Sequence, residues 1–131
     1  SYRFNPPQRG EVVVFRYPKD PQEYYIKRLI GLPGETIAIK DGSIYITDQS
    51  GLTSKLEESY LPTEITTVAL SEEPTQLADD EYYVLGDNRN GSKDSRSFGA
   101  VKKSFITGRV FLRGWPINEF GLIHSGSFEL K

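Results

Sequence analysis

One lysine of this sequence lies inside an otherwise apolar, strand-like run, Tyr24–Ile30. Strand alternation places Lys27 on one face with Tyr25 and Leu29, and the adjacent Arg28 on the other face. We expect one of these two cations to lie against whatever the strand buries. Burial disfavours a charged amine and can turn lysine into a general base, whereas arginine stays protonated. Alternatively, Lys27 extends along the sheet to a carboxylate.

A polar loop, Gly86–Gly99, directly follows a second strand-like run, Tyr82–Leu85. Gly, Asn, Asp and Ser are common turn formers, so an ordinary surface turn is one interpretation of the loop. The loop also carries charges of both signs at close spacing, which predicts an ion-pair network that holds Ser92 rigidly. The charged residues of this predicted network are Asp87, Arg89, Asp94 and Arg96.

The run Lys27–Gly34 and the loop Gly86–Gly99 together resemble two sequence boxes of bacterial type I signal peptidases. A weaker third match is Arg9–Phe15, and the resemblance covers about residues 9 to 113. It implies a serine/lysine dyad, in which a neutral lysine takes the proton of a serine hydroxyl that attacks a peptide carbonyl. The implied activity is the removal of signal peptides from exported proteins, after small residues.

In this resemblance Lys27 matches the general base, and Ser92 matches a serine whose hydroxyl orients the lysine amine. The family's nucleophile lies in a Ser-x-Met-x-Pro motif upstream of the Arg9–Phe15 match, and the sequence contains no methionine. We therefore expect this truncated chain to lack the nucleophile, an oxyanion-hole donor and the membrane anchor, and to be inactive alone. A dyad within the chain, with Ser92, Ser95 or Ser97 as nucleophile, is the alternative.

The resemblance also implies residues that support the site and residues that contact substrate. The supporting residues are Arg28, Asp87, Asn88, Arg89, Asp94 and Arg96. Among them, Asp87 would hold Arg28 away from the reaction centre, while Asp94 and Arg96 would stiffen the site. Tyr25 and Ile26 would line small substrate pockets, on a strand that pairs with an extended peptide. No cofactor or metal is implied, because the base is an amine.

Composition excludes several other classes of function. A net charge of −2 over 131 residues gives no long-range attraction to nucleic acid, whose phosphates need a clustered basic surface. The absence of cysteine rules out disulfides, thiolate zinc sites and a cysteine nucleophile. The single histidine, His124, cannot form a metal site by itself, and we assign it no role. No stretch reaches the roughly 20 apolar residues of a transmembrane helix.

Short runs of β-branched and aromatic residues recur between turn signals, which predicts a mostly β fold. The predicted strands are Val12–Tyr17, Tyr24–Ile30, Thr36–Lys40, Ser43–Ile46, Tyr82–Leu85 and Gly108–Arg113. Asp41 and Gly42 predict a two-residue type I′ hairpin, which needs positive φ at both positions. Gly31–Gly34 predicts a turn that redirects the sheet. Val101–Phe105 predicts a helical turn.

We expect one truncated domain, residues 1–131, built of coiled antiparallel sheets or a partly closed β-barrel of the signal peptidase type. Residues 47–80, hereafter the excursion, are rich in Ser, Thr, Glu and Pro, and only Thr66–Leu70 among them resembles a strand. Trp115 and Pro116 predict a core anchor followed by a chain stop. A missing upstream strand would expose a sheet edge, which predicts self-association.

The implied substrates are signal peptides of exported preproteins, and the implied location is the extracytoplasmic side of a bacterial cell membrane. Two other functions stay open. A repressor-type Ser/Lys self-cleaving protease shares the dyad, although it would not be expected to carry the Gly86–Arg89 box. A non-catalytic, signal-peptidase-like protein would bind peptides or assist surface assembly, although it has no need of a desolvated base.

Overall fold

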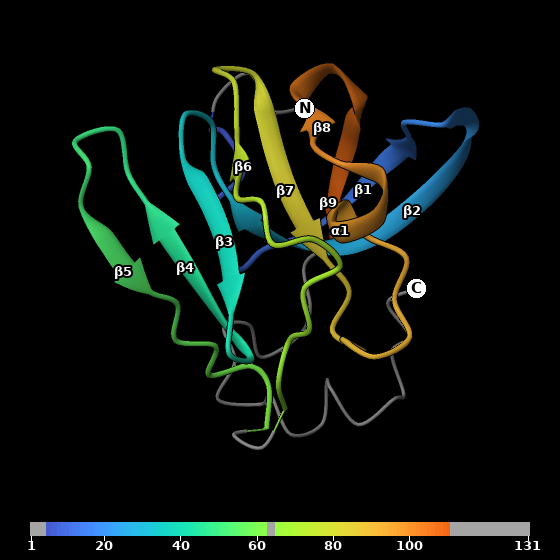
Figure 1. The fold of residues 1–131 in the computed structure, drawn as a ribbon. Coiled ribbons are helices and arrows are strands. Elements are labelled where there is room, and N and C mark those ends of the chain that lie inside the picture. Colours follow the sequence, from blue (N-terminus) through green and yellow to red (C-terminus); the bar gives the residue numbers. More distant parts are fainter. Residues whose placement is uncertain (1–4, 63–64, 111–131) are drawn as a thin grey trace.

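The computed structural model describes residues 5–62 and 65–110, which form two antiparallel β-sheets (Figure 1). The five-stranded sheet has the order β8-β7-β2-β1-β9, and the four-stranded sheet has the order β5-β4-β3-β6. The elements are β1 (Val12–Tyr17), β2 (Asp20–Gly31), β3 (Thr36–Lys40), β4 (Ser43–Thr47), β5 (Thr53–Lys55), β6 (Thr75–Gln76), β7 (Glu81–Leu85), α1 (Ser95–Phe98), β8 (Val101–Lys102), the 3₁₀ helix η1 (Lys103–Phe105) and β9 (Ile106–Val110). The predicted mostly β, antiparallel fold class is confirmed.

Two hydrophobic clusters lie on opposite faces of the five-stranded sheet, and the second is shared with the four-stranded sheet. Side chains that alternate along β1, namely Val13, Phe15 and Tyr17, join Leu29 of β2 in the first cluster. The next residue of β2, Ile30, belongs to the second cluster, with β3 and β4. Because neighbouring residues of a strand point to opposite faces, the C-terminal half of β2 is covered on both sides. The two cations of β2 lie in this half.

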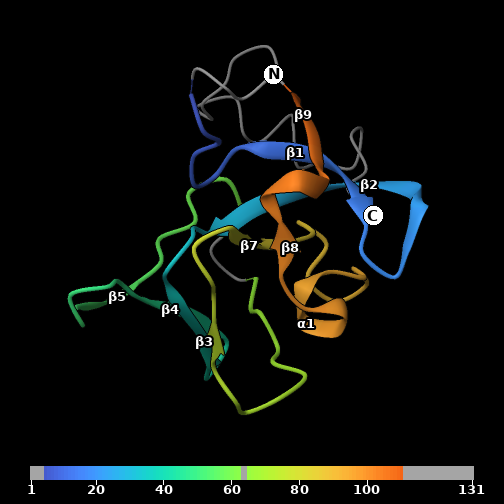
Figure 2. The same ribbon diagram turned by 90° about the horizontal axis from the view of Figure 1, so that it is seen from above.

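Both predicted turns are present. Asp41 has φ 52° and Gly42 has φ 80°, as a type I′ turn requires, and Lys40 pairs with Ser43 across the hairpin. Gly34 has φ 82°, a left-handed conformation that glycine adopts without strain, at the turn between β2 and β3. Seen from above in Figure 2, β5, β4 and β3 lie to the left, and α1 lies to the right beside β7 and β8.

One local prediction is wrong, and a second is confirmed only in part. Thr66–Leu70 is not a strand; its backbone makes isolated bonds instead, such as Thr67 N–H to Gly42 O. The edge strands of the four-stranded sheet are instead β5, which pairs with β4, and β6, which pairs with β3. Val101–Phe105 is only partly helical, because its first two residues form β8 and η1 follows.

The polar loop contains one turn of helix that the sequence analysis did not predict. Asp94 caps α1 by accepting a hydrogen bond from the Arg96 N–H, and this cap fixes where the helix begins. At the C-terminal side, the predicted strand Gly108–Arg113 begins earlier, as β9, and its residues 111–113 lie outside the described residues. The same holds for Trp115, Pro116 and His124.

Candidate active site

Lys27 and Arg28 are both fully buried, each with no exposed surface. We expected one of these cations to be buried, but both are, because side chains cover β2 on both faces. The Lys27 Nζ donates a hydrogen bond to the Ser92 Oγ over 3.2 Å. It also lies 5.6 Å from the centre of the Tyr25 ring. The strand and the polar loop thus bring together the lysine and the serine that the sequence singled out.

Gly86 allows this close approach. A Cβ at this position would lie 1.9 Å from the Ser92 Oγ and 3.5 Å from the Lys27 Nζ. The Gly86 N–H donates to Asp94 Oδ2 over 3.1 Å, and its carbonyl accepts from Arg89 Nε over 2.8 Å. The Gly86 peptide is therefore held from both sides, directly against the lysine and serine.

Asp94 and Arg96 form a buried ion pair beside the serine. Arg96 donates from Nε to Asp94 Oδ1 over 2.9 Å and from Nη2 to Oδ2 over 2.8 Å. Burial raises the pKa of Asp94, but hydrogen bonds from Arg96 and the Gly86 N–H outweigh it, and the Ser92 hydroxyl acts in the same direction. The net pKa of Asp94 lies below its ordinary value, so the carboxylate is ionised at neutral pH.

Arg28 contacts a different part of the same loop. Its Nε and Nη2 donate to the two carboxylate oxygens of Asp87, over 2.9 and 2.6 Å, and its Nη1 donates to Gly10 O over 2.8 Å. Its guanidinium lies 4.1 Å from the centre of the Tyr60 ring. Arg28 is thus held on the face of β2 opposite to Lys27, as the resemblance implies.

The remaining supporting residues differ from one another. Arg89 is buried and donates to Gly86 O, Glu58 and Thr67 Oγ1. Asn88 is exposed, and its carbonyl accepts from the Gly91 N–H in a turn. The structure therefore brings Arg89 into the site but leaves Asn88 at the surface of the loop.

Tyr25 and Ile26 lie just before the lysine on β2. Tyr25 is half-buried and stacks on Tyr17, with ring centres 4.5 Å apart and planes inclined by 6°. Ile26 pairs with Val14 of β1. In the described part of the chain, β7 pairs with β2 only between Arg28 and Gly31, so this edge of β2 has no strand beside Tyr25 and Ile26.

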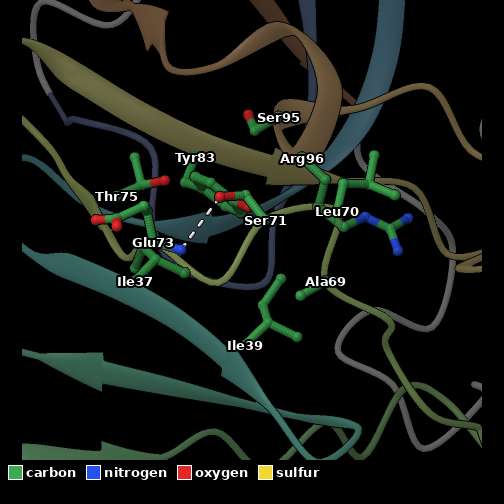
Figure 3. A pocket seen from close by; sticks show the side chains of 10 residues that line it. All are labelled: Ile37, Ile39, Ala69, Leu70, Ser71, Glu73, Thr75, Tyr83, Ser95 and Arg96. Carbon is green, nitrogen blue, oxygen red and sulfur yellow. Dashed lines mark hydrogen bonds between the residues drawn. The ribbon is translucent and has the colours of Figure 1, made fainter.

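A small pocket lies behind the ion pair, between β3, β7, α1 and the excursion (Figure 3). Figure 3 shows Tyr83, Ser95 and Arg96 above Ile37, Ile39 and Ala69, with the hydrogen bond from the Glu73 N–H to Ser71 Oγ drawn between the two groups. The full lining is Ile37, Ile39, Ala69, Leu70, Ser71, Glu73, Thr75, Tyr83, Ser95 and Arg96. Since neither Lys27 nor Ser92 lines this pocket, we do not assign the reacting groups to it.

Two searches of the described residues returned nothing. Among residues 5–62 and 65–110, no three His, Cys, Asp or Glu side chains are grouped in a way that could hold a metal ion. Over the same residues, no helix has the length and apolar character needed to cross a bilayer.

The chain matches the family model described as signal peptidase, peptidase S26, over residues 1–115. The chain belongs to this family. It is 38% identical over 128 residues to a probable signal peptidase I-2 of Synechocystis sp., which covers 94% of this chain and 55% of that protein. It is 40% identical over 129 residues to signal peptidase I of Leptolyngbya laminosa, covering 92% of this chain and 59% of that protein.

A solved structure agrees with this family assignment. The crystal structure of a signal peptidase I from Enterococcus faecalis V583 matches with a TM-score of 0.65 and 32% identity, over 80% of this chain and 97% of that one. Signal peptidase I of Bacillus caldolyticus is 38% identical over 131 residues and is covered to 68% of its length. The chain thus spans less than two thirds of the length of the Synechocystis and Leptolyngbya relatives. It spans slightly more than two thirds of the Bacillus relative.

Sequence reasoning missed the contribution of the excursion to this candidate site. Glu58 and Thr67 contact Arg89, and the Tyr60 hydroxyl donates to Glu58. Glu58 is one of several acidic residues in the excursion, and no spacing in the sequence distinguishes it. The excursion and the loop that follows β7 come together only in the folded chain, so their proximity could not be predicted from the sequence.

Proposed function

We propose that this chain is most of the catalytic domain of a signal peptidase I, with Lys27 as its general base. The observation that carries the proposal is the fully buried Lys27 amine, 3.2 Å from the Ser92 hydroxyl oxygen. Burial disfavours the ammonium form, because charge is poorly solvated there. A neutral amine can take a proton from a hydroxyl, which a solvent-exposed lysine at neutral pH cannot do effectively.

The proposed reaction is acyl transfer. The nucleophilic serine, which we place in a Ser-x-Met-x-Pro motif of the complete polypeptide, gives its proton to the Lys27 Nζ while its Oγ bonds to the substrate carbonyl carbon. The lysine then protonates the leaving amine, which breaks the peptide bond, and a water activated by the same lysine hydrolyses the acyl-enzyme. A neutral amine keeps two N–H groups and one lone pair, so donation to Ser92 helps to direct that lone pair.

We propose that the substrate is the signal peptide of an exported preprotein, bound as an extended strand along the free edge of β2. Tyr25 and Ile26 would contact its side chains, and small pockets there would select small residues before the cleaved bond. The complete protein would be anchored in the bacterial cell membrane, with this domain on the extracytoplasmic side. In the chain alone, the same edge would also favour self-association.

Two observations separate this proposal from its alternatives. A protein that only binds peptides, or assists surface assembly, could use the β2 edge but would not need a buried amine beside a hydroxyl. The match to the signal peptidase model over residues 1–115 favours a signal peptidase over a repressor-type self-cleaving protease.

Cleavage of a signal-peptide substrate tests the proposal. The complete polypeptide should cleave it, and Lys27→Ala should lower the rate by about 10²- to 10⁴-fold, the usual contribution of a general base. This chain alone should give no turnover. Lys27-dependent cleavage by the chain alone would mean that the nucleophile lies within it. Cleavage by the complete polypeptide that survives Lys27→Ala would rule out the dyad.

A further inference from the structure

Arg89 connects the excursion to the candidate site. Its side chain is fully buried, and its Nε donates to Gly86 O over 2.8 Å. Its other end is held by the excursion, where Nη1 donates to Glu58 Oε1 over 2.8 Å and to Thr67 Oγ1 over 2.7 Å, and Nη2 donates to Glu58 Oε2. A guanidinium held by a carboxylate at two points has little freedom to rotate. Its orientation toward Gly86 is therefore set by Glu58.

The same carboxylate reaches the second buried arginine. The Tyr60 hydroxyl donates to Glu58 Oε2, and the Tyr60 ring covers the Arg28 guanidinium at 4.1 Å. Burial, followed by the negative charge of Glu58, raises the pKa of Tyr60 well above its ordinary value, so the hydroxyl keeps its proton. Glu58 thus contacts Arg89 directly and is linked to Arg28 through Tyr60.

A second contact ties the excursion to the other end of the loop. Arg96 donates from Nη1 to Val68 O over 3.0 Å and from Nη2 to Arg89 O over 2.9 Å. In Figure 1 the segment between β5 and β6 runs beside the loop that follows β7, which is where these bonds form. The loop is therefore attached to the excursion at Arg89 and at Arg96.

Gly86 is where these contacts meet the chemistry. Its carbonyl is held by Arg89 and its N–H by Asp94, while its Cα faces the Ser92 Oγ and the Lys27 Nζ. A displacement of about 1 Å in such a place can lower a rate by about 10²-fold, because reacting groups lose alignment. A shift of Arg89 would move the Gly86 peptide against the lysine and serine.

From this chain of contacts we propose that Glu58 is a positioning residue of the active site, acting through Arg89 and Gly86 on the Lys27–Ser92 pair. The excursion is then part of the catalytic architecture, because it supplies the carboxylate that orients the loop. The inference rests on the proposed function, since it assumes that the Lys27–Ser92 pair does the chemistry. Within residues 5–62 and 65–110, the side-chain hydrogen bonds of Glu58 go to Arg89 and Tyr60, so we expect it to influence the chemical step rather than substrate binding.

The test compares Glu58→Gln with Glu57→Gln in the complete polypeptide. Glutamine keeps the shape of the side chain but removes its charge, and the neighbouring Glu57 is exposed, which makes it a matched control. We measure kcat, KM and the pH profile of kcat on a signal-peptide substrate, with each rate divided by the folded fraction from thermal unfolding. Lys27→Ala is measured alongside.

For Glu58→Gln we expect a kcat about 10- to 100-fold lower, with KM nearly unchanged. The acid limb of the kcat profile should move to lower pH, because an uncompensated Arg89 charge disfavours the lysine ammonium. Glu57→Gln should leave all three quantities unchanged. A loss of fold would change only the folded fraction, so the pH shift separates positioning from stability.

If cleavage depends on Lys27 but Glu58→Gln has a wild-type kcat per folded molecule and an unmoved acid limb, the inference about Glu58 is overturned. The proposed function would then still stand. Cleavage independent of Lys27 would overturn the proposed function, and this inference with it. If Glu58→Gln does not fold, Thr67→Val decides the matter. It removes one acceptor of Arg89, and we expect a kcat lower by about two- to tenfold; an unchanged kcat would overturn the inference.

Discussion

Lys27 and Arg28 are neighbours on β2 and equally buried, but the polar loop presents a different oxygen to each. The lysine amine meets the Ser92 hydroxyl, while the arginine meets both carboxylate oxygens of Asp87. A hydroxyl can bond to a neutral or a charged amine, whereas a carboxylate favours the cation. One face of the strand is thus suited to proton transfer and the other to a permanent ion pair. The difference shows how one loop can serve a reactive cation and a structural one.

Removal of the Asp87 carboxylate should have the largest effect on stability. Asp87→Ala leaves Arg28 buried with a charge that has lost its bidentate partner, and such changes cost about 3–5 kcal/mol. The control is Asp80→Ala. Asp80 pairs with Lys102 over 3.7 Å and both side chains are exposed, so the expected loss of stability is about 0–1 kcal/mol. Chemical denaturation measures both. Equal losses for the two variants would mean that Arg28 does not depend on its carboxylate.

Gly86→Ala should disturb the lysine face. The added methyl would lie 1.9 Å from the Ser92 Oγ, so the loop must shift, at an expected cost of about 1–3 kcal/mol in the free energy of unfolding. Cleavage by the complete polypeptide should fall as well, because Ser92 would move away from Lys27. Gly108→Ala is the control, since nothing lies within 4 Å of its added methyl. If both variants behave like wild type, Gly86 does not pack as closely against Ser92 as in the structure.

Acid should weaken the loop through Asp94. Its folded-state pKa lies below the ordinary value of 3.8, so its contribution to stability is complete above that pH and is lost as the pH falls through the lower, folded-state value. Asp94→Asn should reduce the slope of stability against pH in this range, by at most about 1.4 kcal/mol per pH unit. Thermal unfolding between neutral pH and pH values below 3.8 measures this slope. An identical slope in the variant would count against an ionised, hydrogen-bonded Asp94.

The smallest effect should follow Lys27→Met. Replacement of a buried amine by an apolar side chain of similar length is expected to leave the free energy of unfolding unchanged or raise it by about 1 kcal/mol, although activity is lost. Arg28→Met should instead lower stability, because the Asp87 carboxylate loses its partner. Denaturation of both variants sharpens the contrast between the two faces. A large loss in Lys27→Met would mean that the lysine is structural.

Much of this arrangement could be predicted from local sequence. Asp41 and Gly42 fixed a hairpin because few residue pairs accept positive φ at both positions. Ser92, Asp94 and Arg96 lie close together in the charged loop after Tyr82–Leu85. The family resemblance predicted that this loop and Lys27 belong to one site. In these cases the interacting residues are close in sequence or belong to a recognisable pair of motifs.

The rest depended on contacts between distant segments. Glu58 and Thr67 lie 31 and 22 residues from Arg89, so no local pattern connects them. Thr66–Leu70 has the composition of a strand, but no strand of the described residues pairs with it, and its backbone bonds to Gly42 and Arg96 instead. The burial of both cations on β2 also escaped prediction, because alternation tells which residues share a face but not how many faces are covered.

The proposed mechanism requires Lys27 to be a neutral amine, and titration of its side chain measures this. The Lys27 Nζ can be followed by NMR with ¹⁵N-labelled lysine in this chain, and its signal assigned by comparison with Lys27→Arg. The account predicts that the Lys27 pKa lies well below the value of about 10.4 for lysine in water. A titration at that ordinary value would contradict it.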